Sequence, residues 1–225
     1  MENKGGLRMS LYEKGTLRHL AKLNEWTPEQ AQAFDQFNSA VFEEGALSLK
    51  EKEIIAVAVA YATKCPYCLD IHTKKAKQAG ASLQELAEAG FVSAALEAGG
   101  AVAHSSHMQA ALDEEQDDIL YKRSNRNKVG NLSKWSGKGF KAYQQFSAAA
   151  LKSGKLSAQL KELIAVAVAH ITECPYCIDV HSKNAEKAGA TKEQLSEAIL
   201  VAAAVAAGGA YTHIANMIES YGAEE

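Results

Sequence analysis

The feature that most constrains the fold of this chain is an internal repeat at an offset of 109 residues, which separates the two Cys-Pro-Tyr-Cys motifs beginning at Cys65 and Cys174. At this offset residues 48–108 match their counterparts without a gap, and about half of the positions are identical. Chance similarity between two alanine-rich segments would not produce such a match. We therefore interpret the chain as a tandem duplication of one structural unit.

The boundary between the two copies is predicted near residue 118. An acidic run at 113–118 is followed by a basic, polar run at 122–128, and charge runs of this kind are typical of solvated connectors. The copies are therefore assigned to residues 1–118 and 119–225. Each is small for an independent hydrophobic core, so we expect the two to pack together.

The composition favours an all-α fold. The chain has only 3 prolines in 225 residues and is 47% hydrophobic, and proline scarcity favours helices, whose interiors do not tolerate it. Thr27-Pro28 predicts a helix from there to about Glu44, with Gly45 as its stop. Ser48 and Glu51 form a capping box for a helix through Lys64. Similar signals at Ser82 and Thr191 predict the long helices that close each repeat. A buried strand at 54–60, as in glutaredoxins, is the alternative, but the chain supplies no partner strands for it.

Charge and hydropathy exclude several classes of function. A net charge of -3 gives no broad positive field, so nucleic acid is not an expected partner. Residues 1–10 are polar, unlike a secretion signal, and we expect a cytoplasmic protein. The apolar stretches 54–62 and 198–210 are too short or too rich in glycine and alanine to predict a membrane span. Two C-x-x-C pairs in a reducing compartment indicate redox or metal chemistry.

The prolines place each cysteine pair at the start of a helix. Pro66 belongs in a first turn, so Cys65 becomes the N-cap, Cys68 the third helical residue and His72 a residue one turn later on the same face. Gly80 is the expected stop. The second copy repeats this register with Cys174, Pro175, Cys177, His181 and Gly189.

This placement suits thiol chemistry. A cysteine attacks as the thiolate, and the ordinary pKa of about 8.5 falls at a helix N-terminus. His72 lies within reach to take the proton of Cys68, directly or through water. Glu53 on the preceding helix is expected to return towards His72 and orient the imidazole. Glu162 and His181 would do the same for Cys177.

The spacing Glu53-x11-Cys65-x2-Cys68-x3-His72, repeated as Glu162-x11-Cys174-x2-Cys177-x3-His181, resembles the active-site pattern of alkylhydroperoxidase D, within the carboxymuconolactone decarboxylase-like group. The resemblance implies an all-helical fold and an antioxidant peroxidase activity. It also implies that the second cysteine of each pair attacks the peroxide and becomes a sulfenic acid. The first cysteine then closes a redox-active disulfide.

The same resemblance implies the partners. A hydroperoxide is the substrate, and an external dithiol, a lipoyl group or a thioredoxin-like protein, reopens the disulfide. No bound cofactor is expected, because no flavin, haem or nucleotide motif is found. Single-unit relatives are commonly hexamers, so a two-unit chain is expected to form a homo-oligomer, a trimer. The decarboxylases lack the cysteine pair, which argues against decarboxylation. Tyr67 and Tyr176 stand where alkylhydroperoxidase D has a histidine, which leaves the peroxidase rate and the choice of reductant open.

The alternative is a non-catalytic redox sensor or a zinc-binding protein, because each copy offers two thiolates, an imidazole and a carboxylate. One helix presents these groups along a line, however, whereas zinc usually takes its ligands from two elements. His104 and His213 are interpreted as structural, with a place in the pocket left open. Asp70 and Asp179 are interpreted as favourable to the helix dipole.

Overall fold

The computed structural model describes residues 12–112, 119 and 121–222, and within them the chain is helical with no strand. The first copy contains η1 (Lys14–Lys22), α1 (Leu23–Trp26), α2 (Pro28–Val41), α3 (Leu49–Ala62), α4 (Pro66–Gln78) and α5 (Leu83–Leu112). The second contains η2 (Arg123–Asn125), α6 (Arg126–Val129), α7 (Leu132–Trp135), α8 (Gly137–Leu151), α9 (Ala158–Ile171), α10 (Pro175–Lys187) and α11 (Lys192–Tyr221). The all-α, tandem prediction is confirmed, and the strand alternative at 54–60 is wrong because α3 contains those residues. The boundary predicted near residue 118 lies outside the described residues.

Local capping signals explain where several helices begin. Ser48 and Glu51 form the expected capping box at α3, and Thr191 and Gln194 form one at α11. At α5, the Glu85 N–H donates to Ser82 Oγ at 3.2 Å, and the Ser82 N–H donates to the Glu85 carboxylate at 2.7 Å. Each box satisfies N–H groups that the helix itself cannot pair.

The α2 helix begins where it was predicted, but its N-terminal cap and its last residue differ from the prediction. Its first residue is Pro28 as expected, but it ends at Val41 rather than near Glu44, and the Thr27 hydroxyl donates to the Leu23 carbonyl at 3.2 Å instead of capping. In the loop that follows, the carboxylate of Glu197 accepts hydrogen bonds from the backbone N–H groups of residues 46 and 47.

The centre of the molecule is formed by α3 and α9, which lie against each other. Their apolar residues are buried on nearly all sides, and Ile55, Val59, Ile164 and Val168 are 0% exposed. Because the two helices are equivalent in the repeat, a pseudo-twofold relation between the copies passes through this contact. The hydrophobic cluster around it includes residues of both copies, so the two copies share one core.

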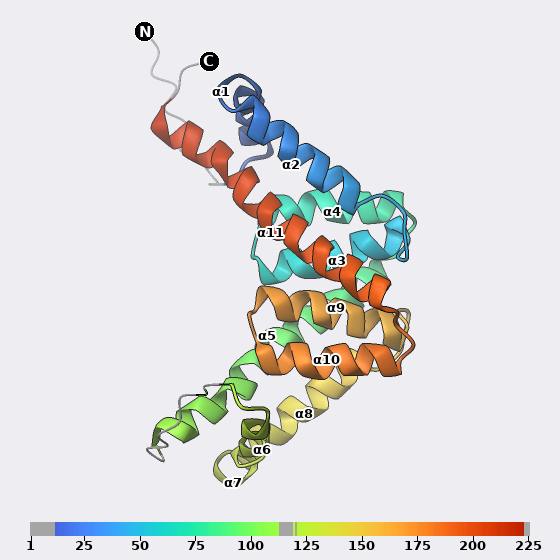
Figure 1. Cartoon of the computed structure of the whole chain (residues 1–225), viewed down its shortest axis with the longest axis vertical. Coiled ribbons are helices and arrows are strands. Elements are labelled where there is room, and N and C mark those ends of the chain that lie inside the picture. Colours follow the sequence, from blue (N-terminus) through green and yellow to red (C-terminus); the bar gives the residue numbers. More distant parts are fainter. Residues whose placement is uncertain (1–11, 113–118, 120, 223–225) are drawn as a thin grey trace.

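Each long helix leaves its own copy to pack on the other. The α5 helix contacts α3 and then runs against α8, α9 and α10 of the second copy. The α11 helix contacts α9 and then runs against η1, α2, α3 and α4 of the first. Figure 1 shows the result, an elongated curved molecule in which α11 lies beside α2 at one end and α5 lies beside α8 at the other. The two copies are therefore interlocked.

The same two helices bear on the expectation that the chain has no membrane span. α5 and α11, of 30 residues each, are long and apolar enough to cross a membrane by length and composition alone, whereas the sequence stretches considered above were shorter. This test is also passed by core helices of proteins outside membranes. Here Val92 and Leu96 of α5 and Val201 and Val205 of α11 are at most 2% exposed within the shared core. Internal packing therefore accounts for much of their apolar character.

Two equivalent carboxylates brace the interlocked helices. Glu88 of α5 accepts hydrogen bonds from the N–H groups of Lys155 and Leu156 at 2.8 and 3.0 Å and pairs with Lys161 at 2.9 Å. Burial alone would raise the pKa of Glu88, but these N–H groups and the ammonium outweigh it and lower the pKa to about 2. Glu197 of α11 makes the same contacts with residues 46 and 47 and pairs with Lys52 at 3.2 Å.

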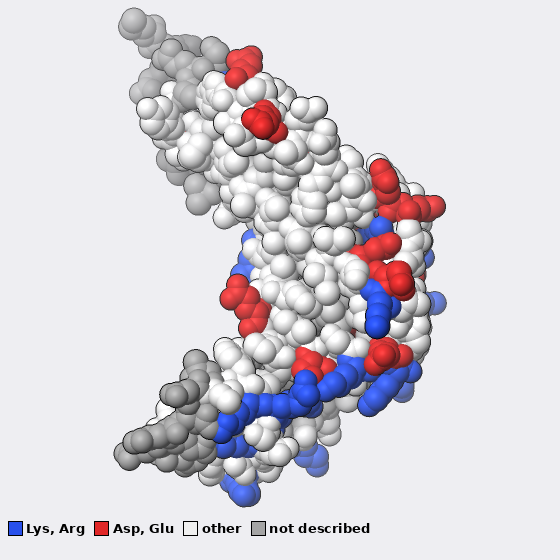
Figure 2. Space-filling view, in the orientation of Figure 1, with Lys and Arg blue, Asp and Glu red and all other residues white. Residues whose placement is uncertain are grey.

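Charge is unevenly spread over the face shown in Figure 2. The end that carries α2 shows acidic side chains, whereas the end that carries α8 and α10 shows mostly basic ones. On this face no basic surface runs from one end to the other. The face therefore offers no extended track for a phosphate backbone.

Candidate active site

The turn before each cysteine pair fixes where the sulfur atoms lie. Two residues after the end of α3, Lys64 adopts the left-handed region at φ 55°, and the Cys65 N–H donates back to the Ala60 carbonyl at 3.3 Å. The Lys64 N–H donates to the Tyr61 carbonyl at 3.2 Å, which completes a Schellman motif. Glu173 repeats this conformation at φ 50°. This tight turn places Cys65 at the start of α4.

The first cysteine of each pair is the N-cap, as predicted. The Cys68 N–H donates to Cys65 Sγ at 3.2 Å, and the Cys177 N–H donates to Cys174 Sγ at the same distance. Pro66 and Pro175 are the first helical residues. Each pair forms a disulfide within one turn, with Cα–Cα distances of 5.3 Å and 5.2 Å. The sulfur atoms therefore lie at the positive end of a helix dipole.

The expected contact between carboxylate and imidazole is present in both copies. Glu53 Oε2 lies 2.7 Å from His72 Nδ1, and Glu162 Oε2 lies 2.7 Å from His181 Nδ1. Glu53 is 1% exposed and His72 is 8% exposed, so in the first copy this pair is shielded from solvent. Antiparallel packing of α3 on α4, and of α9 on α10, brings the partners together across 19 residues. Nδ1 is thereby committed to the carboxylate, and Nε2 lies on the opposite side of the ring.

A cavity opens over the second cysteine of each pair. One cavity is lined by Cys68 and His72, and the other by Cys177 and His181, whereas neither first cysteine is among the lining residues. The opposite wall comes from the other copy in each case. It is formed by Gly208, Tyr211 and Thr212 of α11 over Cys68, and by Gly99, Val102 and Ala103 of α5 over Cys177. Each site is therefore composite.

The glycine pairs of the long helices were not assigned a role from the sequence. A Cβ added at Gly209 would lie 3.8 Å from Cys65 Cβ and 3.9 Å from Cys68 Sγ. The Thr212 hydroxyl lies 3.8 Å from Cys65 Sγ. The available signal was the recurrence of Gly-Gly in both copies, but the sequence could not show that α11 crosses to the disulfide of the other copy.

Asp70 and Asp179 form ion pairs with basic side chains, including those of the preceding segments, rather than contacts with the sulfur atoms. Asp70 pairs with Lys14 at 2.6 Å and with Lys74 at 2.7 Å, and these hydrogen bonds lower its pKa. Asp179 pairs with Lys183, Arg123 and Arg126, and the hydrogen bond from Lys183 is the main cause of its lowered pKa. Besides the expected dipole effect, these aspartates tie η1 and α6 to the cysteine-bearing helices.

The histidines after the glycine pairs contact the tyrosines of the motifs, not the cavities over the thiols. The His213 ring lies 5.8 Å from that of Tyr67, whose hydroxyl accepts a hydrogen bond from Asn216 at 3.3 Å. In the other copy Tyr176 contacts His104 and stacks on His107 at 5.8 Å. Burial lowers the pKa of His104, and the neighbouring His107 lowers it further. Neither His104 nor His213 is among the residues that line the two cavities.

The side chains of the described residues form no ready set of ligands for a metal ion. Among residues 12–112, 119 and 121–222, no group of three or more histidine, cysteine, aspartate or glutamate side chains is placed to hold one. The four cysteines, which would supply the thiolates, are joined in two disulfides. The zinc alternative therefore has no ligand set in the described part of the chain.

These observations define a duplicated, all-helical protein with two C-x-x-C disulfides, each beside a glutamate–histidine pair that is buried in the first copy and partly exposed in the second. The model of the carboxymuconolactone decarboxylase family matches residues 28–113 and 138–220. The chain belongs to this family, in a form that carries two family units in tandem.

The chain is also similar to proteins of several bacteria. A Paracoccus denitrificans protein described as uncharacterised protein 4 in the cox locus is 51% identical over 72 residues, which is 32% of this chain and 65% of that protein. A Haemophilus influenzae protein of undescribed function is 39% identical over 100 residues, 44% of this chain and 88% of that protein. A Burkholderia xenovorans crystal structure, described as a candidate gamma-carboxymuconolactone decarboxylase subunit, superposes with a TM-score of 0.72 at 19% identity. It covers 94% of this chain and 98% of that one, and this likeness supports the fold alone.

Proposed function

We propose that the protein is a thiol-dependent peroxidase that reduces hydroperoxides at two C-x-x-C centres. Cys68 and Cys177 are the attacking thiols, and Cys65 and Cys174 resolve the sulfenic acids. His72 and His181 exchange protons with the thiols, and Glu53 and Glu162 orient the histidines. The observation that carries the proposal is that each cavity is lined by the second cysteine and the histidine together, with the histidine held by a carboxylate at 2.7 Å.

The geometry supports a separate chemical role for each residue of the centre. Because Nδ1 of His72 faces Glu53, Nε2 is the nitrogen that takes the proton of the Cys68 thiol. The helix N-terminus stabilises the resulting thiolate. When the thiolate attacks a peroxide, the S–O bond forms and the O–O bond breaks, and the leaving alkoxide takes the proton back from the imidazolium. Cys65, one turn away, then displaces the hydroxyl as water and forms the disulfide.

Paired serine variants test which thiol attacks. Cys68→Ser with Cys177→Ser should lose all peroxide-dependent formation of sulfenic acid, because no attacking thiol remains. The matched variant, Cys65→Ser with Cys174→Ser, should accumulate a stable sulfenic acid, because nothing resolves it. Labelling of the reduced proteins with a dimedone probe after a pulse of hydrogen peroxide measures both results. Sulfenic acid in the first variant would contradict the assignment of the attacking thiol.

Turnover also needs an external dithiol, for which we propose a lipoyl group or a thioredoxin-like protein. Reduced protein should reform its disulfides with peroxide and lose them again with dihydrolipoamide.

We further propose a cytoplasmic homo-oligomer, with a trimer as the arrangement that places six family units together. The competing function is a non-catalytic redox sensor. A sensor would be oxidised once per protein molecule and would not consume peroxide repeatedly when any dithiol is supplied.

A further inference from the structure

The cavities over the two thiols occupy equivalent places in the repeat but differ in size. The cavity at Cys177 has a volume of about 370 Å³, and the cavity at Cys68 has about 220 Å³. Pockets that enclose organic ligands usually measure roughly 300–1,000 Å³. Only the cavity at Cys177 falls in that range.

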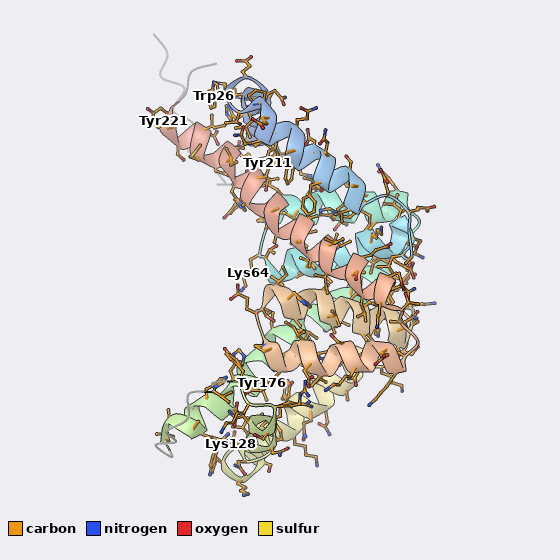
Figure 3. All side chains as sticks on the ribbon, viewed as in Figure 1. Trp26, Lys64, Lys128, Tyr176, Tyr211 and Tyr221 are labelled. Atoms are coloured by element: carbon orange, nitrogen blue, oxygen red, sulfur yellow. A yellow bond between two sulfur atoms is a disulfide. The ribbon has the colours of Figure 1, made fainter. Side chains whose placement is uncertain are left out.

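One wall residue accounts for much of the difference. Tyr211 of α11 lines the smaller cavity and stacks on Phe34 of α2, with ring centroids 4.2 Å apart and planes inclined by 15°. Figure 3 shows Tyr211 where α11 passes α2. Its counterpart over Cys177 is Val102 of α5, whose side chain has no ring. Tyr143, the counterpart of Phe34, also lines that cavity, and its ring stacks on Phe140 instead, with centroids 6.3 Å apart.

The residues of the long helix that lie over the disulfide also pack more closely at the first centre than at the second. Gly209 and Thr212 lie against the Cys65–Cys68 disulfide, and a Cβ at Gly209 would be 3.9 Å from the sulfur atoms. Over the other disulfide, a Cβ added at Gly100 would have no neighbour within 4 Å, and Ala103 replaces the threonine. Directly above its disulfide the second centre is therefore less closely covered than the first, although a Cβ at the neighbouring Gly99 would lie 3.2 Å from the Tyr143 hydroxyl and one at its counterpart Gly208 would meet nothing within 4 Å.

The two cavities differ in one charged side chain, while both mix apolar and polar walls. At the first centre, Lys75 lines the cavity with its ammonium 5.5 Å from the Phe42 ring centroid. Its counterpart Asn184 is neutral, and its amide lies 3.5 Å from Glu162. Arg126 also lines the second cavity, but its charge is paired with Asp179 at 3.3 Å. The apolar part of that lining comes from Leu96, Val102, Val129, Phe140 and Leu151, beside the polar Gln144 and Ser147, and the first cavity also has apolar walls, from Leu17, Leu20, Phe34 and Ile71.

We propose that the two centres take different substrates: Cys177 reduces hydroperoxides with a bulky apolar substituent, and Cys68 reduces hydrogen peroxide and short-alkyl hydroperoxides. This rests on the peroxidase function proposed above. In both reactions the sulfur is oxidised by two electrons and the O–O bond is reduced, giving an alcohol or water. The apolar substituent contributes binding only at Cys177, where Val102 leaves space for it.

Two single-centre proteins test this. Cys65→Ser with Cys68→Ser leaves only the second centre, and Cys174→Ser with Cys177→Ser leaves only the first. After reduction, the loss of thiols is timed in a single turnover with cumene hydroperoxide and with hydrogen peroxide. The cumene-to-hydrogen peroxide rate ratio should be at least about tenfold higher at the second centre, the discrimination that a fitting apolar pocket gives.

Exchange of the wall residues then tests the cause. Val102→Tyr in the second-centre protein should lower the ratio about tenfold, and Tyr211→Val in the first-centre protein should raise it. Met108→Tyr adds the same side chain to a 49% exposed position on the same helix and should leave the ratio as it was. Equal ratios in the two single-centre proteins, or a Val102→Tyr ratio equal to its parent's, would overturn the proposal. Absence of thiol oxidation by both peroxides at both centres would instead overturn the peroxidase function.

Discussion

The residue before each cysteine pair holds a backbone conformation that its side chain disfavours. Lys64 has φ 55° and Glu173 has φ 50°, in the left-handed region that costs a residue with a Cβ roughly 1–2 kcal/mol. Glycine holds the equivalent C-terminal position after α4 and α10, at Gly80 and Gly189. The strain lies directly beside the redox centre, where it makes the turn that sets Cys65 at the N-cap.

Lys64→Gly should therefore stabilise the oxidised protein by about 0.5–1 kcal/mol, because glycine removes the Cβ clash at some cost in unfolded-state entropy. Chemical denaturation measures the free energy of unfolding. Lys64→Ala is the matched control, because it also removes the distant contact with Glu97 at 3.9 Å but keeps the Cβ. Equal stability of the glycine and alanine variants would show that the conformation carries no strain.

At the scale of the helices, the braces of α5 and α11 tie stability to pH. The pKa of Glu88 is about 2 in the folded chain against an ordinary 4.5. A carboxyl whose pKa is lowered by folding contributes stability that is full above its unfolded pKa and is lost as the pH falls towards the folded pKa. Its contribution is therefore present at pH 7 and declines between about pH 4.5 and pH 2.

Glu88→Gln should lower the free energy of unfolding by about 2 kcal/mol at pH 7, because it weakens two hydrogen bonds to a charge and leaves the Lys161 ammonium without its carboxylate. The difference from the parent protein should shrink as the pH approaches 2. Denaturation curves at pH 7 and pH 3 measure both effects. Glu44→Gln, at an exposed loop position, should change stability by less than about 0.5 kcal/mol. A deficit that is equal at the two pH values would contradict the titration of Glu88.

The helices also show which features the sequence could predict. Capping boxes, the prolines after the cysteines and the stops at Gly80 and Gly189 act within a few residues, so the starts of α3, α4, α5 and α11 were predicted correctly. Glu53 and His72 are 19 residues apart, and helix packing sufficed to expect their contact. Glu197 binds the loop after α2, 150 residues away in the sequence. No local pattern encodes that contact, and it was missed.

The whole molecule depends on the exchange of long helices between the copies. The sequence predicted two units packed together, but not that α11 walls the first site and α5 walls the second. Nothing in a repeat distinguishes a helix that folds back on its own copy from one that crosses to the next. The duplicated chain is arranged like a dimer of single units whose closing helices have been exchanged.

Residues 1–118 expressed alone should therefore form a symmetric dimer rather than a folded monomer. In isolation the outer part of α5 loses α8, α9 and α10, and α3 loses α9 and α11. A second copy can supply equivalent surfaces and rebuild the shared core. Sedimentation equilibrium measures the mass, and reaction of Cys68 with hydrogen peroxide reports whether its cavity is rebuilt. Ile55→Glu, which places a charge at a 0% exposed position in the central contact, is the control and should abolish both. A folded, fully reactive monomer would show that a single copy can close its own site, and the helix exchange would then be unnecessary for the chemistry.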